Sequence, residues 1–199
     1  MNRWIMGLTT TGTVVALPYD QQVKRYAQKY GLIPADLSRF GDLYGGKWAH
    51  WVLFSAILGN RVLHALPRIE MYYQFQYALV ALGVNGALTA GLKLAVGRER
   101  PNGAGNRSFP SGHTSHSFVV AAVADELFGP KVGIPAYLIG GLVAVHRIHD
   151  NKHYLSDVIF GAGMGTIVGR GFAYSYREAN PRFSVIPNLN GGVTLTYLF

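Results

Sequence analysis

The sequence contains no cysteine among its 199 residues. A disulfide framework, a thiolate-bound metal and a cysteine nucleophile are therefore excluded. Charged residues are also scarce, at 14% of the chain against about 25% in an average soluble domain. With 49% hydrophobic residues, this deficit favours a membrane protein, although a mean hydropathy of +0.16 is low for a bundle fully embedded in lipid.

Acidic residues are outnumbered by basic ones, 10 to 18, which gives a net charge of +8. Such an excess suits nucleic acid, anionic lipid or a phosphate-bearing substrate. The chain has no basic run typical of nucleic-acid binding, and its cations instead border apolar segments near glycines, prolines and histidines. This distribution favours a small anionic group over a polymer. The cations in question are Lys93, Arg98, Arg100, Arg107 and Arg147.

Mostly apolar stretches that could be helical fill the chain after residue 45. They cover residues 46–66, 73–97, 111–128, 132–147 and 155–174. A membrane-spanning helix needs about 20 apolar residues, which 73–97 provides and 111–128 and 132–147 do not. Abundant glycine and alanine let helices approach closely, as in membrane bundles. The predicted fold class is all-α, a transmembrane helical bundle, with a glycine-rich soluble bundle as the alternative.

The two ends of the chain differ from this core, although residues 1–199 are expected to form one domain. The first 16 residues fit a short membrane segment or a cleaved signal peptide. Residues 19–45 predict one or two short amphipathic helices, interrupted at Gly31 and Pro34. In the tail, 182–199, a period-two pattern after an Asn-Gly-Gly turn predicts a small hairpin or terminal strand.

The first candidate motif is a pair of cations before a proline, Lys93 and Arg100-Pro101. Seven residues apart, Lys93 and Arg100 would share one face of a continuous helix. Pro101 disfavours helix at the residue before it, so Arg100 is expected at or near the helix end. Cations at that end also complement the helix dipole, so this motif alone is weak.

The second motif is Pro110-Ser111-Gly112-His113. Ser111 is placed to cap the following helix, and Gly112 lets another group approach the backbone. Free N–H groups at a helix start form an anion site, beside which His113 would lie. By itself the string is more simply explained as a capped helix with an incidental histidine.

The third motif joins Arg147, His153 and Asp157. If a helix begins near residue 153, the four-residue step puts Asp157 beneath His153, where its carboxylate can fix the imidazole tautomer. His146, His149 and His153 could also suggest a metal site. A metal is less attractive because Arg147 and Lys152 would crowd the cation and no carboxylate cluster offsets them.

In a bundle of alternating helix directions, all three motifs lie at the same end. Three permanent cations and backbone donors bind a tetrahedral oxyanion well, and two histidines supply chemistry. The residues brought together are Lys93, Arg100, Ser111, Gly112, His113, Arg147, His153 and Asp157.

In order, K-x6-R-P, P-S-G-H and R-x5-H-x3-D resemble the signature of the type 2 phosphatidic acid phosphatase (PAP2) superfamily, over roughly residues 73–174. The resemblance implies that His153 is the nucleophile, that Asp157 orients it, and that His113 protonates the leaving oxygen and then activates water. It implies no metal and no cofactor. The phosphate-binding groups it implies are Lys93, Arg100, Arg147, the Ser111 hydroxyl and the Gly112 N–H.

One position departs from the family pattern, because His146 stands where the family usually has serine. We expect altered local hydrogen bonding there and no loss of activity.

The resemblance predicts a membrane lipid phosphatase that hydrolyses a phosphate monoester or pyrophosphate through a phosphohistidine. The alternatives are a soluble or peripheral acid phosphatase acting on small esters, a vanadium-dependent haloperoxidase, and a non-catalytic membrane protein. The expected partners are a phosphorylated lipid and the membrane, with no nucleic acid.

The loops near Arg68, Lys131 and Arg177 would be cytoplasmic by the positive-inside rule. That orientation predicts a periplasm-facing site in a bacterial-type inner membrane. The cations of 19–45 lie on the site's side and weaken this argument, so a periplasmic or outer-membrane-associated protein is the alternative.

Overall fold

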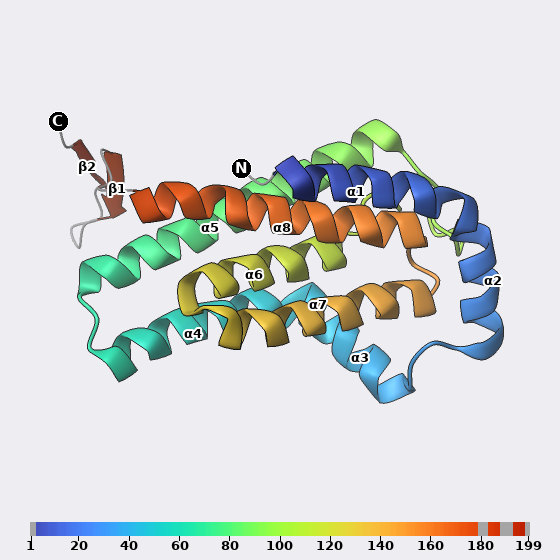
Figure 1. The fold of residues 1–199 in the computed structure, drawn as a ribbon, viewed down its shortest axis with the longest axis horizontal. Helices are drawn as coiled ribbons and strands as arrows, with labels where there is room; N and C mark the ends of the chain where they lie inside the picture. The colour runs from blue at the N-terminus through green and yellow to red at the C-terminus, as the bar shows by residue number, and fades with distance from the viewer. Residues whose placement is uncertain (1–2, 179–182, 188–192, 198–199) are drawn as a thin grey trace.

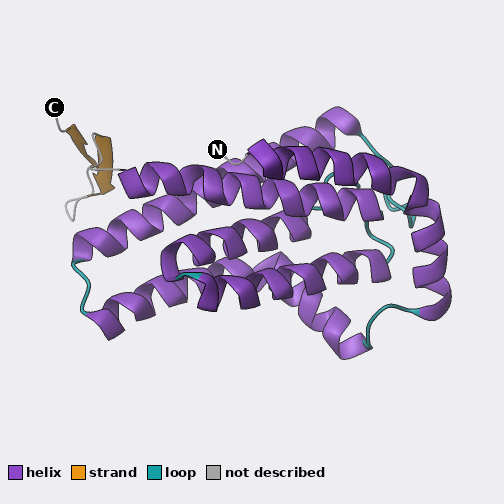
Figure 2. Cartoon of the chain, viewed as in Figure 1, coloured by secondary structure: helices purple, strands orange, loops and turns teal. Residues whose placement is uncertain are grey.

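The computed structural model describes residues 3–178, 183–187 and 193–197. The described chain is a helical bundle followed by one antiparallel hairpin (Figures 1 and 2). Its helices are α1 (Arg3–Ala16), α2 (Asp20–Tyr30), α3 (Ala35–Leu43), α4 (Ala49–His64), α5 (Arg68–Val96), α6 (Gly112–Phe128), α7 (Pro130–His149) and α8 (Leu155–Glu178). A 3-10 turn (Leu17–Tyr19) joins α1 to α2, and a π-helical turn (Tyr44–Trp48) joins α3 to α4.

The five predicted apolar stretches correspond to α4, α5, α6, α7 and α8, so the all-α bundle is confirmed. The interpretation of Lys93 and Arg100 as residues of one helical face was wrong. α5 ends at Val96 because Gly97 takes a left-handed conformation (φ 57°) that closes the helix. Arg100 therefore lies in the loop that follows, and not on the same helical face as Lys93.

α6 lies in the middle of the bundle and packs against α5, α7 and α8, while α1 packs along α8 (Figure 1). The middle of α6 is buried on every side, and it carries the largest share of the apolar core. Val119, Val120 and Val123 are its largest fully buried apolar side chains.

A stripe of glycines brings α8 close to α6. Gly161, Gly165 and Gly169 are spaced by four residues, so they lie on one face of α8. A Cβ at Gly165 would lie 2.3 Å from the carbonyl oxygen of Ser115, and one at Gly161 would lie 2.8 Å from that of Ser111. Glycine is therefore required for this approach, which seats the start of α8 against the start of α6.

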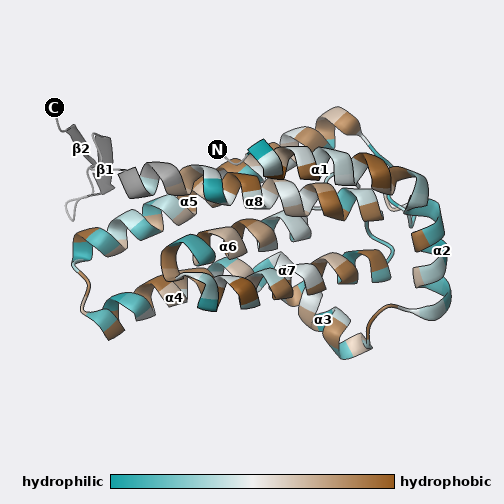
Figure 3. Ribbon diagram, viewed as in Figure 1, coloured by the Kyte–Doolittle hydropathy of each residue, from teal (hydrophilic) through white to brown (hydrophobic). Residues whose placement is uncertain are grey.

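Large apolar side chains are exposed on the outer faces of the bundle. α5 and α7 are long and apolar enough to cross a membrane. Figure 3 shows hydrophobic residues along the outside of α4 and α5 as well as between helices. More than half of the side chain is exposed at Trp51, Leu58, Leu63, Leu79, Leu94 and Leu138. Contact with lipid acyl chains would bury this surface.

The polar segment before the core divides into α2 and α3 around Gly31 and Pro34, as predicted. The first residues form α1, which packs along α8 and not apart from the bundle. In the tail, β1 (Phe183–Pro187) pairs with β2 (Val193–Tyr197), which confirms the hairpin. The predicted Asn-Gly-Gly turn, 190–192, lies outside the described residues.

Candidate active site

The site residues expected from the sequence converge at one end of the bundle. α5 and α7 end there, α6 and α8 begin there, and α2 crosses that end (Figure 1, right). The cations, imidazoles and carboxylate of the three motifs are close enough to act on one another electrostatically. The alternating helix directions thus produce the predicted cluster.

Lys93, in the last turn of α5, is anchored by backbone carbonyls. Its Nζ donates to the carbonyl oxygens of Arg107 and Pro110, both at 2.7 Å. These bonds hold the ammonium beside the start of α6. A Cβ at Gly112 would lie 3.7 Å from Lys93 Cε, so the helix start and the lysine stem are in direct contact.

Arg100 and Arg147 each have a buried guanidinium nitrogen that is unpaired. In the described part of the chain, neither Nε has a hydrogen-bond partner. Buried polar groups are nearly always paired in folded proteins. Two unpaired donors on cations at one site are available to bind an anion.

Ser111 occupies the N-cap position of α6, as predicted, but its hydroxyl does not cap the backbone. The side chain is fully buried, and its Oγ lies 2.9 Å from Thr114 Oγ1. The Ser111 N–H donates to the carbonyl oxygen of Asp157 at 3.1 Å, which ties the start of α6 to the start of α8.

His113 lies in the first turn of α6 with about a third of its side chain exposed (32%). Its Nε2 is 3.6 Å from Asp42 Oδ1. Burial and then the Arg147 charge lower the pKa of His113 to about 4, while Asp42 opposes this shift. In the phosphate-free site the imidazole is therefore neutral at pH 7, and a bound dianion would raise its proton affinity.

His153 is almost fully buried in the loop between α7 and α8. Its Nδ1–H donates to the carbonyl oxygen of Ser108 at 2.6 Å. Because a carbonyl accepts only, this bond fixes the tautomer that leaves a lone pair on Nε2. Burial lowers the pKa of His153 to about 4, and the Arg147 charge adds to the effect. A neutral imidazole with a free Nε2 is the form that a nucleophile needs.

Asp157 was expected to contact His153 directly, and in the structure it does not. Its Oδ2 is 3.8 Å from His153 Nδ1, too far for a hydrogen bond. The carboxylate instead accepts from the Ser108 hydroxyl (2.5 Å) and the Tyr154 N–H (2.9 Å). The helix begins at Leu155, two residues later than the four-residue step assumed. Asp157 therefore reaches the imidazole through Ser108, whose hydroxyl and carbonyl face the two groups.

Two residues that were not predicted from the sequence to be part of the site, Arg98 and Asp20, hold Asp157 in position. Arg98 donates to Asp157 Oδ1 and to Asp20 Oδ2, both at 2.7 Å, and its guanidinium lies over the Tyr154 ring. Asp20 in turn accepts from the backbone and hydroxyl of Ser156. Asp20 and Asp157 are both buried, but Asp20 lies in a segment without a motif, so no signal in the sequence marked it.

Asp42 also escaped sequence reasoning, because 19–45 carries no motif. Its Oδ1 lies 3.0 Å from Arg147 Nη1 and 3.4 Å from His146 Nε2. Burial raises the pKa of Asp42, but Arg147 and the neighbouring histidines outweigh this and bring it below its ordinary value. The site therefore contains an ionised carboxylate that the three motifs do not include.

His146, the departure from the family pattern, is buried and hydrogen-bonded. The side chain is 1% exposed, and its Nδ1 is 2.8 Å from Ser38 Oγ. The Ser38 hydroxyl donates its hydrogen to Asp150 Oδ1 at 2.9 Å. Ser38 Oγ therefore accepts a hydrogen bond from His146, so the proton of this imidazole is on Nδ1. The residue thus fastens α3 to α7.

The three histidines considered as a metal site bind different groups. His146 contacts Ser38, His153 contacts Ser108, and His149 Nδ1 accepts from the Leu32 N–H at 3.0 Å. Within residues 3–178 and the two described strands, no group of three His, Asp or Glu side chains could hold a metal ion.

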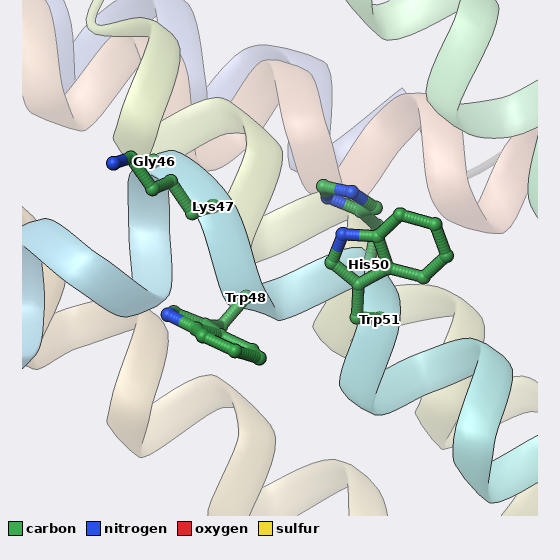
Figure 4. Close-up of a pocket in the computed structure, with 5 residues that line it drawn as sticks. All are labelled: Gly46, Lys47, Trp48, His50 and Trp51. Carbon is green, nitrogen blue, oxygen red and sulfur yellow. The ribbon is translucent and has the colours of Figure 1, made fainter.

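A hollow of about 440 Å³ lies on the π-helical turn next to His113 (Figure 4). Trp48 and Trp51 point to different sides of it, and Lys47 runs past Gly46, away from both indoles. A Cβ at Gly46 would lie 2.7 Å from His113 Nε2. Gly46, one of the residues that line the hollow, is therefore packed against the imidazole of His113.

Fold and site together define an α-helical protein with two buried or half-buried imidazoles and three cations at one end of its bundle, an oxyanion site of the phosphoryl-transfer type. The sequence profile of the PAP2 superfamily matches residues 75–181, more than half of the chain. The chain belongs to this superfamily.

Individual relatives agree with this membership. Over 95 residues the chain is 37% identical to the lipid A 1-phosphatase of Porphyromonas gingivalis, covering 45% of this chain and 21% of the relative. It is 27% identical to lipid phosphate phosphatase 1 of Arabidopsis thaliana, covering 56% and 46%. The chain thus spans less than half the length of either relative.

Two solved structures share the fold. The transmembrane PAP2-type phosphatidylglycerolphosphate phosphatase of Bacillus subtilis matches with a TM-score of 0.68 at 20% identity, over 90% of this chain and 96% of that one. Aquifex aeolicus LpxE matches with a TM-score of 0.60 at 21% identity, over 78% and 94%.

Proposed function

We propose that this protein is a membrane phosphatase that hydrolyses a phosphate ester or pyrophosphate of a lipid through a phosphohistidine, without a metal. The observation that carries the proposal is the fixed tautomer of His153, whose Nδ1–H is held by the Ser108 carbonyl in a cluster containing two unpaired guanidinium donors. Relatives named as lipid phosphatases support the substrate class.

In the first step, His153 Nε2 attacks phosphorus and a P–N bond forms as the bond to the leaving oxygen breaks. His113 takes up a proton from solvent when the substrate dianion binds, and its Nε2 gives this proton to that oxygen. Lys93, Arg100 and Arg147 hold the phosphoryl oxygens, and positioning with charge stabilisation supplies most of the acceleration. The positive charge on His153 is stabilised by Asp157 through Ser108.

In the second step, His113 takes a proton from water, and the resulting hydroxide attacks phosphorus. The P–N bond breaks, inorganic phosphate leaves, and His153 returns to its neutral tautomer. His113 has then recovered the proton it donated. It returns this proton to solvent when phosphate leaves, so the cycle balances.

The lipid part of the substrate is supported by the exposed apolar faces of α4, α5 and α7. A lipid phosphate held in the same bilayer would present its head group near the bundle end. We infer that the site faces the periplasm of a bacterial-type inner membrane, since the Arg68 and Lys131 loops lie at the opposite end.

Phosphate release from a panel of lipid phosphates and one small ester, p-nitrophenyl phosphate, tests the proposal. His153→Ala is expected to fall to background, and His113→Ala to lose about 10²–10⁴-fold in kcat. His64→Ala, at the far end of α4, is the matched control and should retain activity. Near-normal turnover by purified His153→Ala would overturn the assignment, and so would strong inhibition by EDTA.

Orientation can be measured by single-cysteine labelling, because the chain has no cysteine of its own. A membrane-impermeant maleimide should label Asn102→Cys, in the site loop, in intact spheroplasts and leave Lys131→Cys unlabelled. The reverse pattern would place the site on the cytoplasmic side.

A further inference from the structure

The segment that carries Asp42 is docked onto the site by specific contacts. A Cβ at Gly41 would lie 2.9 Å from His146 Cβ, so glycine lets α3 approach α7 at this point. One turn earlier, Ser38 is hydrogen-bonded to both His146 and Asp150. The position of Asp42 is therefore set by Gly41 and Ser38 on the same helix, although its own side chain is 57% exposed.

One carboxylate oxygen of Asp42, Oδ1, lies close to two groups with which bound phosphate would interact. Oδ1 is 3.0 Å from Nη1 of Arg147, a cation of the phosphate site. The same oxygen is 3.6 Å from Nε2 of His113, the proposed proton donor. An anionic oxygen between a phosphate-holding cation and the proton donor has the surroundings expected for a phosphoryl oxygen.

We propose that Asp42 acts as a built-in competitor for the phosphate site: its carboxylate pairs with Arg147 when the site is free and weakens the binding of inorganic phosphate and other phosphate-like dianions. This inference rests on the proposed function, because it assigns a role to the site's own phosphate-binding cation. Asp42 is a positioning residue in this scheme and makes no bond to phosphorus.

The charge balance explains why such a competitor is useful. Lys93, Arg100 and Arg147 together would hold a product dianion tightly, and tight product binding slows release. A carboxylate that reoccupies Arg147 offsets part of that attraction. Because the side chain is more than half exposed, it can swing into solvent when substrate arrives without disturbing the core.

Binding of inorganic phosphate and inhibition by orthovanadate test the proposal in Asp42→Asn, with Asp42→Ser as a second variant. Both should lower the dissociation constant for phosphate and the inhibition constant for vanadate by about tenfold, as expected when a like charge is removed from a site. Asp36→Asn, an exposed aspartate on the same helix, is the matched control and should change neither constant.

Constants equal to those of the wild type, or weaker binding in both Asp42 variants, would overturn the proposal. Direct phosphate binding measured calorimetrically in detergent does not depend on turnover, which separates the two hypotheses. Tighter phosphate binding by Asp42→Asn with no hydrolysis of any lipid by the wild type would support Asp42 as a competitor and defeat the proposed function. Lipid hydrolysis by the wild type with unchanged phosphate binding in the variants would support the proposed function and defeat the role of Asp42 as a competitor.

Discussion

Arg98 bridges two buried carboxylates that are far apart in the chain. Its Nη1 is 2.7 Å from Asp157 Oδ1 and its Nη2 is 2.7 Å from Asp20 Oδ2, 78 residues before it. Asp157 is fully buried and Asp20 is 3% exposed, so neither charge has water to replace the guanidinium. The bridge connects the N-terminal segment to the carboxylate behind His153.

Replacing Arg98 with glutamine should therefore destabilise the protein and slow catalysis. Removal of one partner from a buried ion pair costs about 3–5 kcal/mol, and loss of support for a catalytic group costs about 10–100-fold in activity. Thermal unfolding in detergent and kcat measure the two effects.

A second variant tests whether the loss of stability comes from the ion pairs of Arg98 and not from the removal of a positive charge in general. Adding Asp20→Asn to Arg98→Gln removes one of the two unpaired charges and should recover part of the stability. Arg25→Gln, an exposed cation on α2, is the control. An Arg98→Gln protein as stable and active as the wild type would contradict the prediction.

Stability should fall as the pH is lowered from neutral. His113, His116 and His153 each have a pKa lowered by burial to about 4, against an ordinary value of 6.5. Between these values the unfolded chain binds more protons than the folded one, so their contribution is complete above pH 6.5 and is lost toward pH 4.

Chemical unfolding at about pH 7 and about pH 4.5 should show this loss as a lower midpoint. His116 lies one turn beyond His113 and hydrogen-bonds to His50 and not to the site. His116→Leu should make the pH dependence shallower. Equal midpoints at the two pH values would show that the histidines are not buried in neutral form.

The contact between α6 and α8 should not tolerate a side chain at Gly165. A Cβ there would lie 2.3 Å from a backbone carbonyl oxygen, which cannot rotate away as a side chain does. Overpacking of this kind costs about 1–3 kcal/mol. Gly165→Ala is therefore expected to lower the unfolding temperature.

Gly171, on the same helix, provides the matched control. A Cβ at this position meets nothing within 4 Å. Since alanine favours helix over glycine by about 1 kcal/mol, Gly171→Ala should be neutral or stabilising. Similar unfolding temperatures for both variants would show that the helices are not packed as closely as described.

The hollow beside His113 predicts a difference between lipid and small substrates. Trp48 is 56% exposed and lines this hollow, where the leaving group of a lipid phosphate would lie beyond His113. Trp48→Ala should lower kcat/KM for the lipid by about tenfold, the order expected for an aromatic contact in a binding site, and leave p-nitrophenyl phosphate hydrolysis unchanged.

Trp4→Ala removes another exposed indole (83%) from α1, away from the hollow, and should affect neither substrate. An equal loss on both substrates in Trp48→Ala would mean that the indole supports the catalytic groups and not the leaving group.

The helices were predictable because their signals are local. Runs of apolar residues, Gly31, Pro34 and the period-two tail depend on neighbours a few positions apart, and the structure places elements at each of them. The cluster of cations and imidazoles was also predictable, because alternating helix directions bring every second chain reversal to the same end. The exception was the end of α5, where the left-handed Gly97 stops the helix before Arg100.

Which group touches which was decided by the tertiary structure. His153 binds the Ser108 carbonyl and not Asp157, because the carboxylate is already occupied by Ser108, Tyr154 and Arg98. No spacing rule within one helix could reveal these competing partners.

The amino-acid sequence by itself determined the bundle, the order of the three motifs and the end at which they meet, since each follows from short-range pattern and chain direction. The docking of Asp42 against Arg147, 105 residues away, and the bridge from Asp20 to Arg98 were decided only by the packing of α2 and α3 across that end. Single carboxylates in a segment without a motif carry no local signal, and their partners are chosen by which buried cation the fold brings within reach.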